Sequence, residues 1–133
     1  VRYLGFVPDK DISALYAEAG GLVMPTFFGP TNIPVLEAFA VGCPVVTSDI
    51  RGIREQTDGG AILVDPRNPE AIADGLRRLL TSSDERCALI RRGREVLARH
   101  TPEDYRRTLK RALEDAKARL RDAGRDVRRI AAL

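Results

Sequence analysis

Four short apolar runs, separated by segments with helical periodicity, limit the folds open to this chain more than any other feature. The runs cover residues 2–6, 22–24, 44–47 and 61–64. Short, continuous apolar runs are typical of strands buried on both faces of a parallel sheet, and the segments between them predict crossover helices. The sequence therefore predicts an α/β fold with a partial parallel sheet of about four strands and a helical C-terminal region.

Helix boundaries are marked by a few residues with known end preferences. Asn68 followed by Pro69 predicts the start of one helix, and Gly42 predicts the end of another. Asp9 or Asp11 is expected to cap the first helix, which a pair of glycines ends. The expected helices cover residues 12–19, 34–41, 69–80, 84–99 and 102–123.

Apolar residues in the helix at residues 84–99 recur at helical spacing, so we expect Leu89, Ile90, Val96 and Leu97 to face inward. The last expected helix carries Tyr105, Leu109, Leu113 and Leu120. Gly124 is expected to end the last helix.

The 133 residues, of which 44% are hydrophobic, fit one globular domain with a workable core. We expect that domain to cover residues 1–123, with residues 124–133 as a C-terminal tail. The start at Val1 resembles the interior of a strand rather than a signal peptide, which predicts that an upstream part of the protein is absent. No apolar run approaches ~18 residues, so no transmembrane helix is expected.

Cysteine and histidine usage argues against a disulfide scaffold or a metal site. Cys43 and Cys87 are expected to be reduced thiols of a cytoplasmic protein. His100 is the only histidine, and no cluster of cysteines and histidines accompanies it. We therefore expect no zinc site and no nucleophilic mechanism that depends on a histidine base.

Charge is distributed unevenly along the chain. Residues 86–133 carry fifteen basic and seven acidic side chains, whereas residues 1–85 have a net charge of −5. The basic helices predict either contact with an anionic surface, such as the inner face of a membrane or a partner domain, or a solvated arginine-rich face. Nucleic acid is not expected as a partner, because no aromatic stacking platform accompanies the charge.

The segment after the second apolar run concentrates residues suited to binding an anion. Ligands of doubly wound sheets bind at the carboxyl ends of the strands, which is where this segment lies. Pro34 suits the first turn of a helix, and Thr31 and Asn32 stand where cap residues belong. Free amides from Asn32 to Val35 are expected to converge in front of this helix and favour a phosphate.

Glu37 lies one turn inside this short apolar helix. A buried carboxylate needs a partner, and a ribose diol can supply two hydrogen-bond donors to it. The alternative is a glutamate that pairs with an arginine or lies exposed at the helix edge. The residues alone leave both interpretations open.

The stretch PVLEAFAVGCPVVTS, residues 34–48, resembles the donor-site motif of glycosyltransferase family 4. Residues 49–66, Leu4-Gly5-Phe6-Val7 and Leu15-Tyr16 extend the similarity, which covers about residues 1–115. The resemblance implies the later part of the Rossmann-like, nucleotide-sugar-binding C-terminal domain of a GT-B enzyme. Such an enzyme transfers a sugar from a nucleotide-diphosphate sugar to an acceptor with retention, without a further cofactor.

The resemblance also implies roles for individual residues. The family has two glutamates with seven residues between them; the second falls on Glu37, which would hold the ribose, but the first falls on Gly29. No catalytic residue is therefore assigned, and Asn32 or backbone amides are expected to take over the sugar contacts. Glu55 is interpreted as a helix-start carboxylate. The implied donor-binding residues are Phe6 and Val7 near the base, together with Gly29, Thr31, Asn32, Ile33, Pro34, Val35 and Glu37.

Two other functions stay open at this point: a nucleotide-sugar epimerase of the same architecture, and a non-catalytic binding or assembly module. The family's basic pair that clamps the diphosphate, and its acceptor-binding N-terminal domain, have no counterpart here, so the isolated chain is expected to be inactive. The neighbour of residues 22–24 in the family's sheet is also absent. We therefore expect a homodimer, a strand-swapped assembly, or residues 2–6 paired directly beside residues 22–24.

Overall fold

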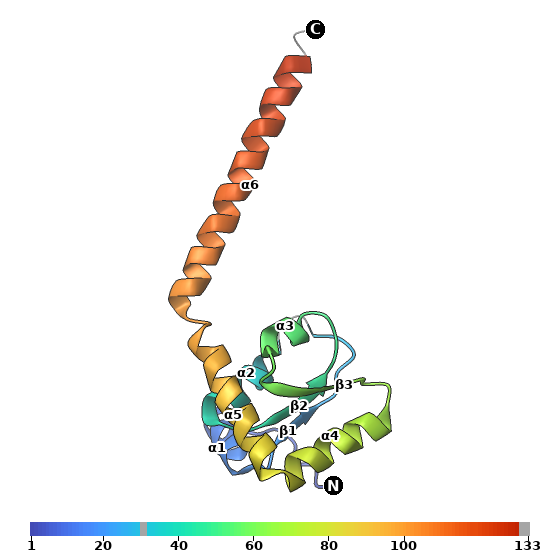
Figure 1. Ribbon diagram of the computed structural model, residues 1–133. Helices are drawn as coiled ribbons and strands as arrows, with labels where there is room; N and C mark the ends of the chain where they lie inside the picture. The colour runs from blue at the N-terminus through green and yellow to red at the C-terminus, as the bar shows by residue number, and fades with distance from the viewer. Residues whose placement is uncertain (30–31, 131–133) are drawn as a thin grey trace. The chain divides into compact units, whose positions relative to one another are not determined.

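The computed structural model describes residues 1–29 and 32–130, with side chains up to residue 121. It divides into two compact units, Val1–Ala98 and Arg99–Leu133, which are described separately. The first unit is an α/β structure with a parallel sheet, and the second is helical (Figure 1). The fold class predicted from the sequence is therefore confirmed.

The sheet has three parallel strands rather than the four expected. Its strands β1 (Leu22–Met24), β2 (Val45–Ser48) and β3 (Ala61–Val64) lie in that order, with Val23, Val46 and Ile62 in register. The prediction of a strand at residues 2–6, paired beside β1, is wrong. Gly5 has a φ of +68°, which interrupts an extended backbone, and residues 2–6 are all exposed without a pairing strand.

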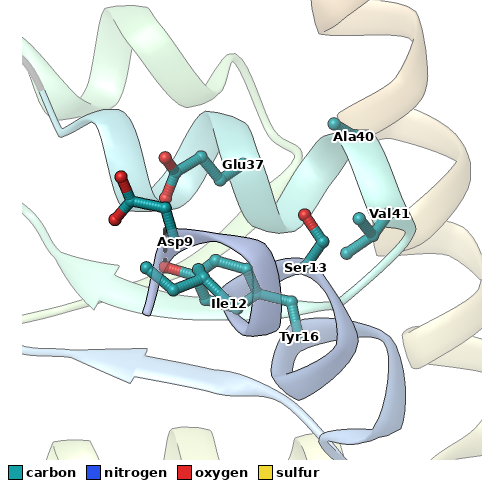
Figure 2. Close-up of a pocket in the computed structure, with 7 residues that line it drawn as sticks. All are labelled: Asp9, Ile12, Ser13, Tyr16, Glu37, Ala40 and Val41. Carbon is teal, nitrogen blue, oxygen red and sulfur yellow. Dashed lines mark hydrogen bonds between the residues drawn. The ribbon is translucent and has the colours of Figure 1, made fainter. Parts of the chain in front are cut away.

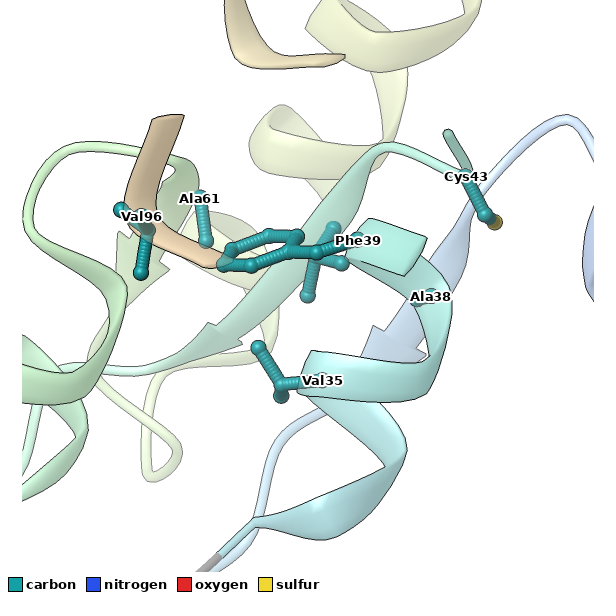
Figure 3. Close-up of a cluster of buried hydrophobic side chains, with 7 residues drawn as sticks. Val35, Ala38, Phe39, Cys43, Ala61 and Val96 are labelled. Atoms are coloured by element: carbon teal, nitrogen blue, oxygen red, sulfur yellow. The ribbon is translucent and has the colours of Figure 1, made fainter. Parts of the chain in front are cut away.

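One face of the sheet is covered by α1 (Asp9–Glu18), α2 (Ile33–Val41) and α5 (Ser83–Ala98). Phe39 of α2 is at the centre of this buried cluster, between the sheet and α5 (Figure 3). The cluster consists of Val35, Ala38, Phe39, Cys43, Val45, Ala61 and Val96. Because α2 contributes three of these residues, its orientation on the sheet is fixed by its own buried side.

The other face of the sheet is covered by α4 (Pro69–Thr81), where Leu79 is fully buried. Gly75 allows α4 to approach closely, because a Cβ at this position would lie 3.1 Å from Val46 Cγ1. The cluster on this face consists of Val46, Ile62, Val64 and Leu79, together with Leu89 from the first half of α5, which thus contributes to both clusters. Strand residues thus alternate between two cores, as a sheet with helices on both faces requires.

The helix ends confirm some sequence predictions and contradict others. Asn68 caps α4, since its side chain accepts hydrogen bonds from two backbone amides, and Gly42 ends α2 with a φ of 79°. The predicted cap of α1 is wrong: Pro8 occupies the cap position, and neither aspartate caps the helix. The short helix α3 (Ile53–Thr57) has no range among the expected helices, although the interpretation of Glu55 as a helix-start carboxylate implies a helix start here.

The second unit consists mainly of α6 (Pro102–Ile130). Thr101 caps it, because the Asp104 amide donates a hydrogen bond to Thr101 Oγ1 over 3.1 Å. The expected end at Gly124 is wrong, since the helix continues to Ile130. The apolar residues that α6 carries, Tyr105, Leu109, Leu113 and Leu120, are exposed, from 47% at Leu109 to 74% at Leu120. Among the helices described, none is long and apolar enough to cross a bilayer.

Candidate functional site

The carboxyl ends of β1 and β2 are joined by two side-chain hydrogen bonds. Thr47 Oγ1 donates to the Met24 carbonyl oxygen over 3.1 Å, and Ser48 Oγ donates to the Thr26 carbonyl oxygen over 2.5 Å. Both hydroxyl-bearing residues are fully buried. The loop that leaves β1 is therefore held against β2 before it leads to α2.

Asn32 occupies the cap position of α2 but does not use its side chain to cap the helix. Its backbone carbonyl accepts hydrogen bonds from the Val35 amide over 3.1 Å and from Gln56 Nε2 over 3.4 Å. The Val35 amide therefore already has a hydrogen-bond partner, and Pro34 has no amide hydrogen. Of the free amides expected to point toward an anion in front of α2, those at Ile33 and its surroundings remain. Thr31 lies outside the described residues.

The side chain of Asn32 packs against Gly29 instead. A Cβ at position 29 would overlap Asn32 Oδ1 and would lie 3.3 Å from Asn32 Nδ2. Asn32 is only 6% exposed, and its Nδ2 has no hydrogen-bond partner among the residues that the structure describes. The position that corresponds to the family's first glutamate therefore has no room for a side chain while Asn32 stays in place.

Glu37 is exposed, whereas Val35, Ala38 and Phe39 on the same helix are buried. Its Oε2 accepts a hydrogen bond from the Tyr16 hydroxyl of α1 over 3.3 Å (Figure 2). This geometry corresponds to the exposed-edge interpretation of Glu37, but it also leaves the carboxylate open to a ligand. The ribose-binding role stays a prediction.

Glu37 lines a hollow of about 420 Å³ between α1 and α2, which we call the α1–α2 hollow. Its charged lining is acidic, and two hydroxyl groups accompany the two carboxylates (Figure 2). Its lining residues are Asp9, Ile12, Ser13, Tyr16, Glu37, Ala40 and Val41. Two carboxylates repel a phosphate but accept hydrogen bonds from sugar hydroxyls.

Tyr16 is the site residue that the sequence analysis missed. It had no expected role in the site, and its ring packs against the buried cluster to which α2 contributes. Burial and the neighbouring Glu37 raise the pKa of the Tyr16 hydroxyl. The available signal was that a partly buried tyrosine hydroxyl needs a hydrogen-bond partner, but the sequence does not show which residue supplies it.

Phe6 and Val7 do not share the α1–α2 hollow with Glu37. They line a separate hollow on the other side of α1, together with Leu4, Pro8, Asp11, Ala14, Leu15 and Glu18. The Phe6 side chain is 91% exposed. Their expected contact with a nucleotide base stays a prediction.

A third hollow, of about 330 Å³, lies where the strands end. It is lined by Phe27, Asp49, Ile50, Asp65, Pro66 and Arg67. Its carboxylates already have partners: Arg54 pairs with Asp49 at 2.6 Å, and the Arg67 amide donates to Asp65 Oδ1 over 2.9 Å. This hollow is therefore less open to a new ligand than the α1–α2 hollow.

Glu55 has the structural role that the sequence predicted. Its Oε2 accepts a hydrogen bond from the Gly52 amide over 2.7 Å at the start of α3. Backbone hydrogen bonds hold the pKa of this carboxyl below its usual range. Cys43 and Cys87 are both free thiols, and burial raises the pKa of Cys43. Within the described ranges, no three side chains of the metal-binding types cluster together.

Comparisons with known proteins identify sequences that are similar to this chain. Residues 1–96 match the family described as "Glycosyl transferases group 1". The chain is 40% identical over 73 residues to the O-antigen chain mannosyltransferase B of Escherichia coli, which covers 55% of this chain and 19% of that protein. It is 32% identical over 111 residues to the D-inositol 3-phosphate glycosyltransferase of Corynebacterium urealyticum, covering 82% of this chain and 26% of that protein.

A glycogen synthase of Mycobacterium tuberculosis is 33% identical over 102 residues, which cover 75% of this chain and 24% of that protein. The chain thus spans about a fifth to a quarter of the length of these curated relatives.

Proposed function

The chain belongs to the group 1 glycosyl transferases, and on that premise we propose that it binds the donor of a retaining glycosyltransferase. The donor is a nucleotide-diphosphate sugar, whose glycosyl group passes to an acceptor with retention of anomeric configuration. In this proposal Glu37 accepts the ribose hydroxyls, and the start of α2 faces the diphosphate.

The observation that carries this proposal is the open carboxylate of Glu37 at the second glutamate position of the family motif. It lies on the exposed side of α2 and lines the α1–α2 hollow with Asp9, Ser13 and Tyr16. A hollow with two carboxylates and two hydroxyls suits a neutral polyol better than a phosphate. The ribose of a nucleotide is such a polyol.

The start of α2 supports binding of the diphosphate nearby. Helix N-termini favour anions because backbone amides and the helix dipole point toward them. The Ile33 side chain is 59% exposed there, and no acidic side chain lies in the first turn of α2. A diphosphate at this end and a ribose beside Glu37 lie one helical turn apart on the same helix.

Gly29 departs from the family motif, so the reacting sugar is recognised in another way. We propose that Asn32, whose side chain occupies the space next to Gly29, forms part of the sugar contact. Because the chain spans only about a fifth to a quarter of its relatives' length, we also propose that turnover needs further parts of a full-length enzyme. A cytoplasmic location and a membrane-surface contact of the basic helices stay predictions.

Transfer by the full-length enzyme tests this function. UDP-, GDP- and ADP-sugars are offered with inositol 3-phosphate, glycogen or an O-antigen chain, the acceptors that the relatives' names suggest. We expect acceptor-dependent release of one nucleoside diphosphate, and NMR of the anomeric proton should show retention in the product.

Each other outcome identifies a different function. An epimerised nucleotide sugar formed without an acceptor indicates the epimerase. Donor binding without consumption indicates a non-catalytic module, which the glycine at position 29 favours. A product of inverted anomeric configuration contradicts the proposed mechanism.

A further inference from the structure

The hydrogen bond between Tyr16 and Glu37 joins α1 to α2 through two residues that are 21 positions apart in the chain. Tyr16 lies on α1 and Glu37 on α2, and both side chains line the α1–α2 hollow (Figure 2). Among the described residues, no second hydrogen bond is made to the side-chain oxygens of Glu37. This contact is therefore the feature that sets where the Glu37 carboxylate points.

The two partners differ in how firmly they are held. The ring of Tyr16 packs against the buried cluster that contains Val35, Ala38 and Phe39, so the core fixes the position of its hydroxyl. Burial and the negative charge of Glu37 raise the pKa of that hydroxyl, so it remains a donor at neutral pH. Glu37 is exposed, and a free glutamate side chain samples several rotamers.

The geometry of the bond leaves Glu37 able to bind a ligand. A carboxylate can accept about four hydrogen bonds, and Tyr16 uses one of them at Oε2. The Oε1 atom and the remaining acceptor positions stay available to the two donors of a vicinal diol. Asp9 lines the same hollow, and its negative charge disfavours a phosphate there.

We infer that Tyr16 is a positioning residue, which holds the Glu37 carboxylate in the orientation that accepts both hydroxyls of a nucleotide ribose. This inference rests on the proposed function, because the diol is the ribose of the donor. Orientation before binding reduces the entropy that the complex loses, so removal of the Tyr16 hydroxyl weakens binding even though Tyr16 need not touch the ligand.

Nucleotide titrations of the full-length enzyme test this inference. UDP, GDP and ADP are titrated by calorimetry, and the one that binds most tightly is compared with its 2′,3′-dideoxy analogue. The variants are Tyr16→Phe, which keeps the ring in the core, and Glu37→Gln, which removes the charge. Tyr105→Phe is the matched control, since Tyr105 is 70% exposed on α6.

We expect Tyr16→Phe to weaken the ribonucleotide about threefold to tenfold, the usual range for one lost hydrogen bond. The dideoxy analogue should bind Tyr16→Phe and the wild type equally, because the contact that Tyr16 orients is missing from it. In the Glu37→Gln background, Tyr16→Phe should have little further effect. Tyr105→Phe should leave both affinities unchanged.

Three results distinguish a failure of the inference about Tyr16 from a failure of the proposed function on which it rests. If Tyr16→Phe weakens the ribonucleotide and its dideoxy analogue equally, Tyr16 acts on the fold and the inference is wrong. If Glu37→Gln weakens the ribonucleotide but Tyr16→Phe does not, the inference fails and the proposed function stands. If Glu37→Gln leaves ribonucleotide affinity unchanged, the ribose assignment itself fails.

Discussion

Glu37 lies on a helix whose opposite side is buried in the core, so its carboxylate faces the α1–α2 hollow. We expect Glu37→Ala in the full-length enzyme to weaken binding of the preferred nucleoside diphosphate by about 10- to 150-fold. This range follows from the ~1.5–3 kcal/mol that hydrogen bonds to charged groups contribute. Calorimetric titration measures it, and Glu114→Ala on α6 is the control. An unchanged dissociation constant would show that Glu37 is an exposed surface residue with no role in nucleotide binding.

Gly29 and Asn32 form a matched pair of small and large residues. A Cβ at position 29 would overlap Asn32 Oδ1, so we expect Gly29→Ala to destabilise the chain by about 1–3 kcal/mol, as overpacking does. Chemical denaturation measures this loss. The backbone of Gly29 has no positive φ, so the loss comes from crowding and not from backbone strain.

A double-mutant cycle identifies the origin of that loss. Asn32→Ala removes the three Asn32 atoms that the new Cβ would meet, and Asn32 makes no side-chain cap that its removal would cost. Gly29→Ala should therefore cost less than about 0.5 kcal/mol in the Asn32→Ala background. Equal losses in both backgrounds would show that Asn32 is not the obstacle.

At this scale, the sequence identified residues by type and spacing but not by their contacts. Glu55 could be placed at a helix start because local spacing decides that role, and the structure confirms it. The orientation of the Asn32 side chain could not be predicted, since capping is its usual behaviour and the contact with Gly29 replaces it. The Tyr16–Glu37 bond depends on how two distant helices pack.

Helix boundaries divide into those set by local signals and those set by packing. The start of α4 followed from Asn68 and Pro69, because a cap and a proline act within one turn. The start of α1 at Asp9 could not be predicted in this way. Pro8 occupies the cap position, so both aspartates lie inside the first turn of the helix and neither caps it. The five-residue α3 is too short to show a helical period in the sequence.

The contact between α2 and α5 depends on a glycine that the apolar pattern did not reveal. Gly93 is buried between Leu89 and Val96 on α5, and a Cβ there would lie 2.7 Å from Phe39 Cδ1. Overpacking lowers the free energy of unfolding by about 1–3 kcal/mol, whereas the higher helix propensity of alanine over glycine raises it by about 1 kcal/mol. We expect Gly93→Ala to lower the free energy of unfolding by up to a net ~2 kcal/mol, measured by chemical denaturation.

Two further variants check the cause of that change. Arg91→Ala alters an exposed position on the same helix, and its ion pair with Glu95 at 3.5 Å contributes little, so we expect no measurable change. Phe39→Leu replaces the aromatic ring with a smaller side chain and so removes the ring with which a Cβ at position 93 would clash. The double variant should then lose less stability than the two single losses added together, whereas simple additivity would contradict direct crowding.

For the whole molecule, the parallel sheet followed from the apolar runs, but the number of strands did not. Residues 22–24, 45–48 and 61–64 are strands because each has a neighbour to pair with. Residues 2–6 have a similar apolar pattern but do not pair with β1, although its outer edge is open, because Gly5 has a φ of +68° that interrupts an extended backbone.

The open edge of β1 leads to the last prediction, which concerns self-association of this 133-residue chain. Within the described sheet, β1 pairs with β2 alone, and Val23 on this edge strand is 36% exposed. An unpaired edge with an exposed apolar residue is a template for another strand. We expect a homodimer or a strand-swapped assembly, measured by multi-angle light scattering over a range of concentrations. Val23→Lys should shift the chain toward monomer with an unchanged far-UV circular dichroism spectrum, because a charge on an edge strand blocks pairing while the buried core stays intact. A wild-type chain that is monomeric at every concentration would show that this edge is not used.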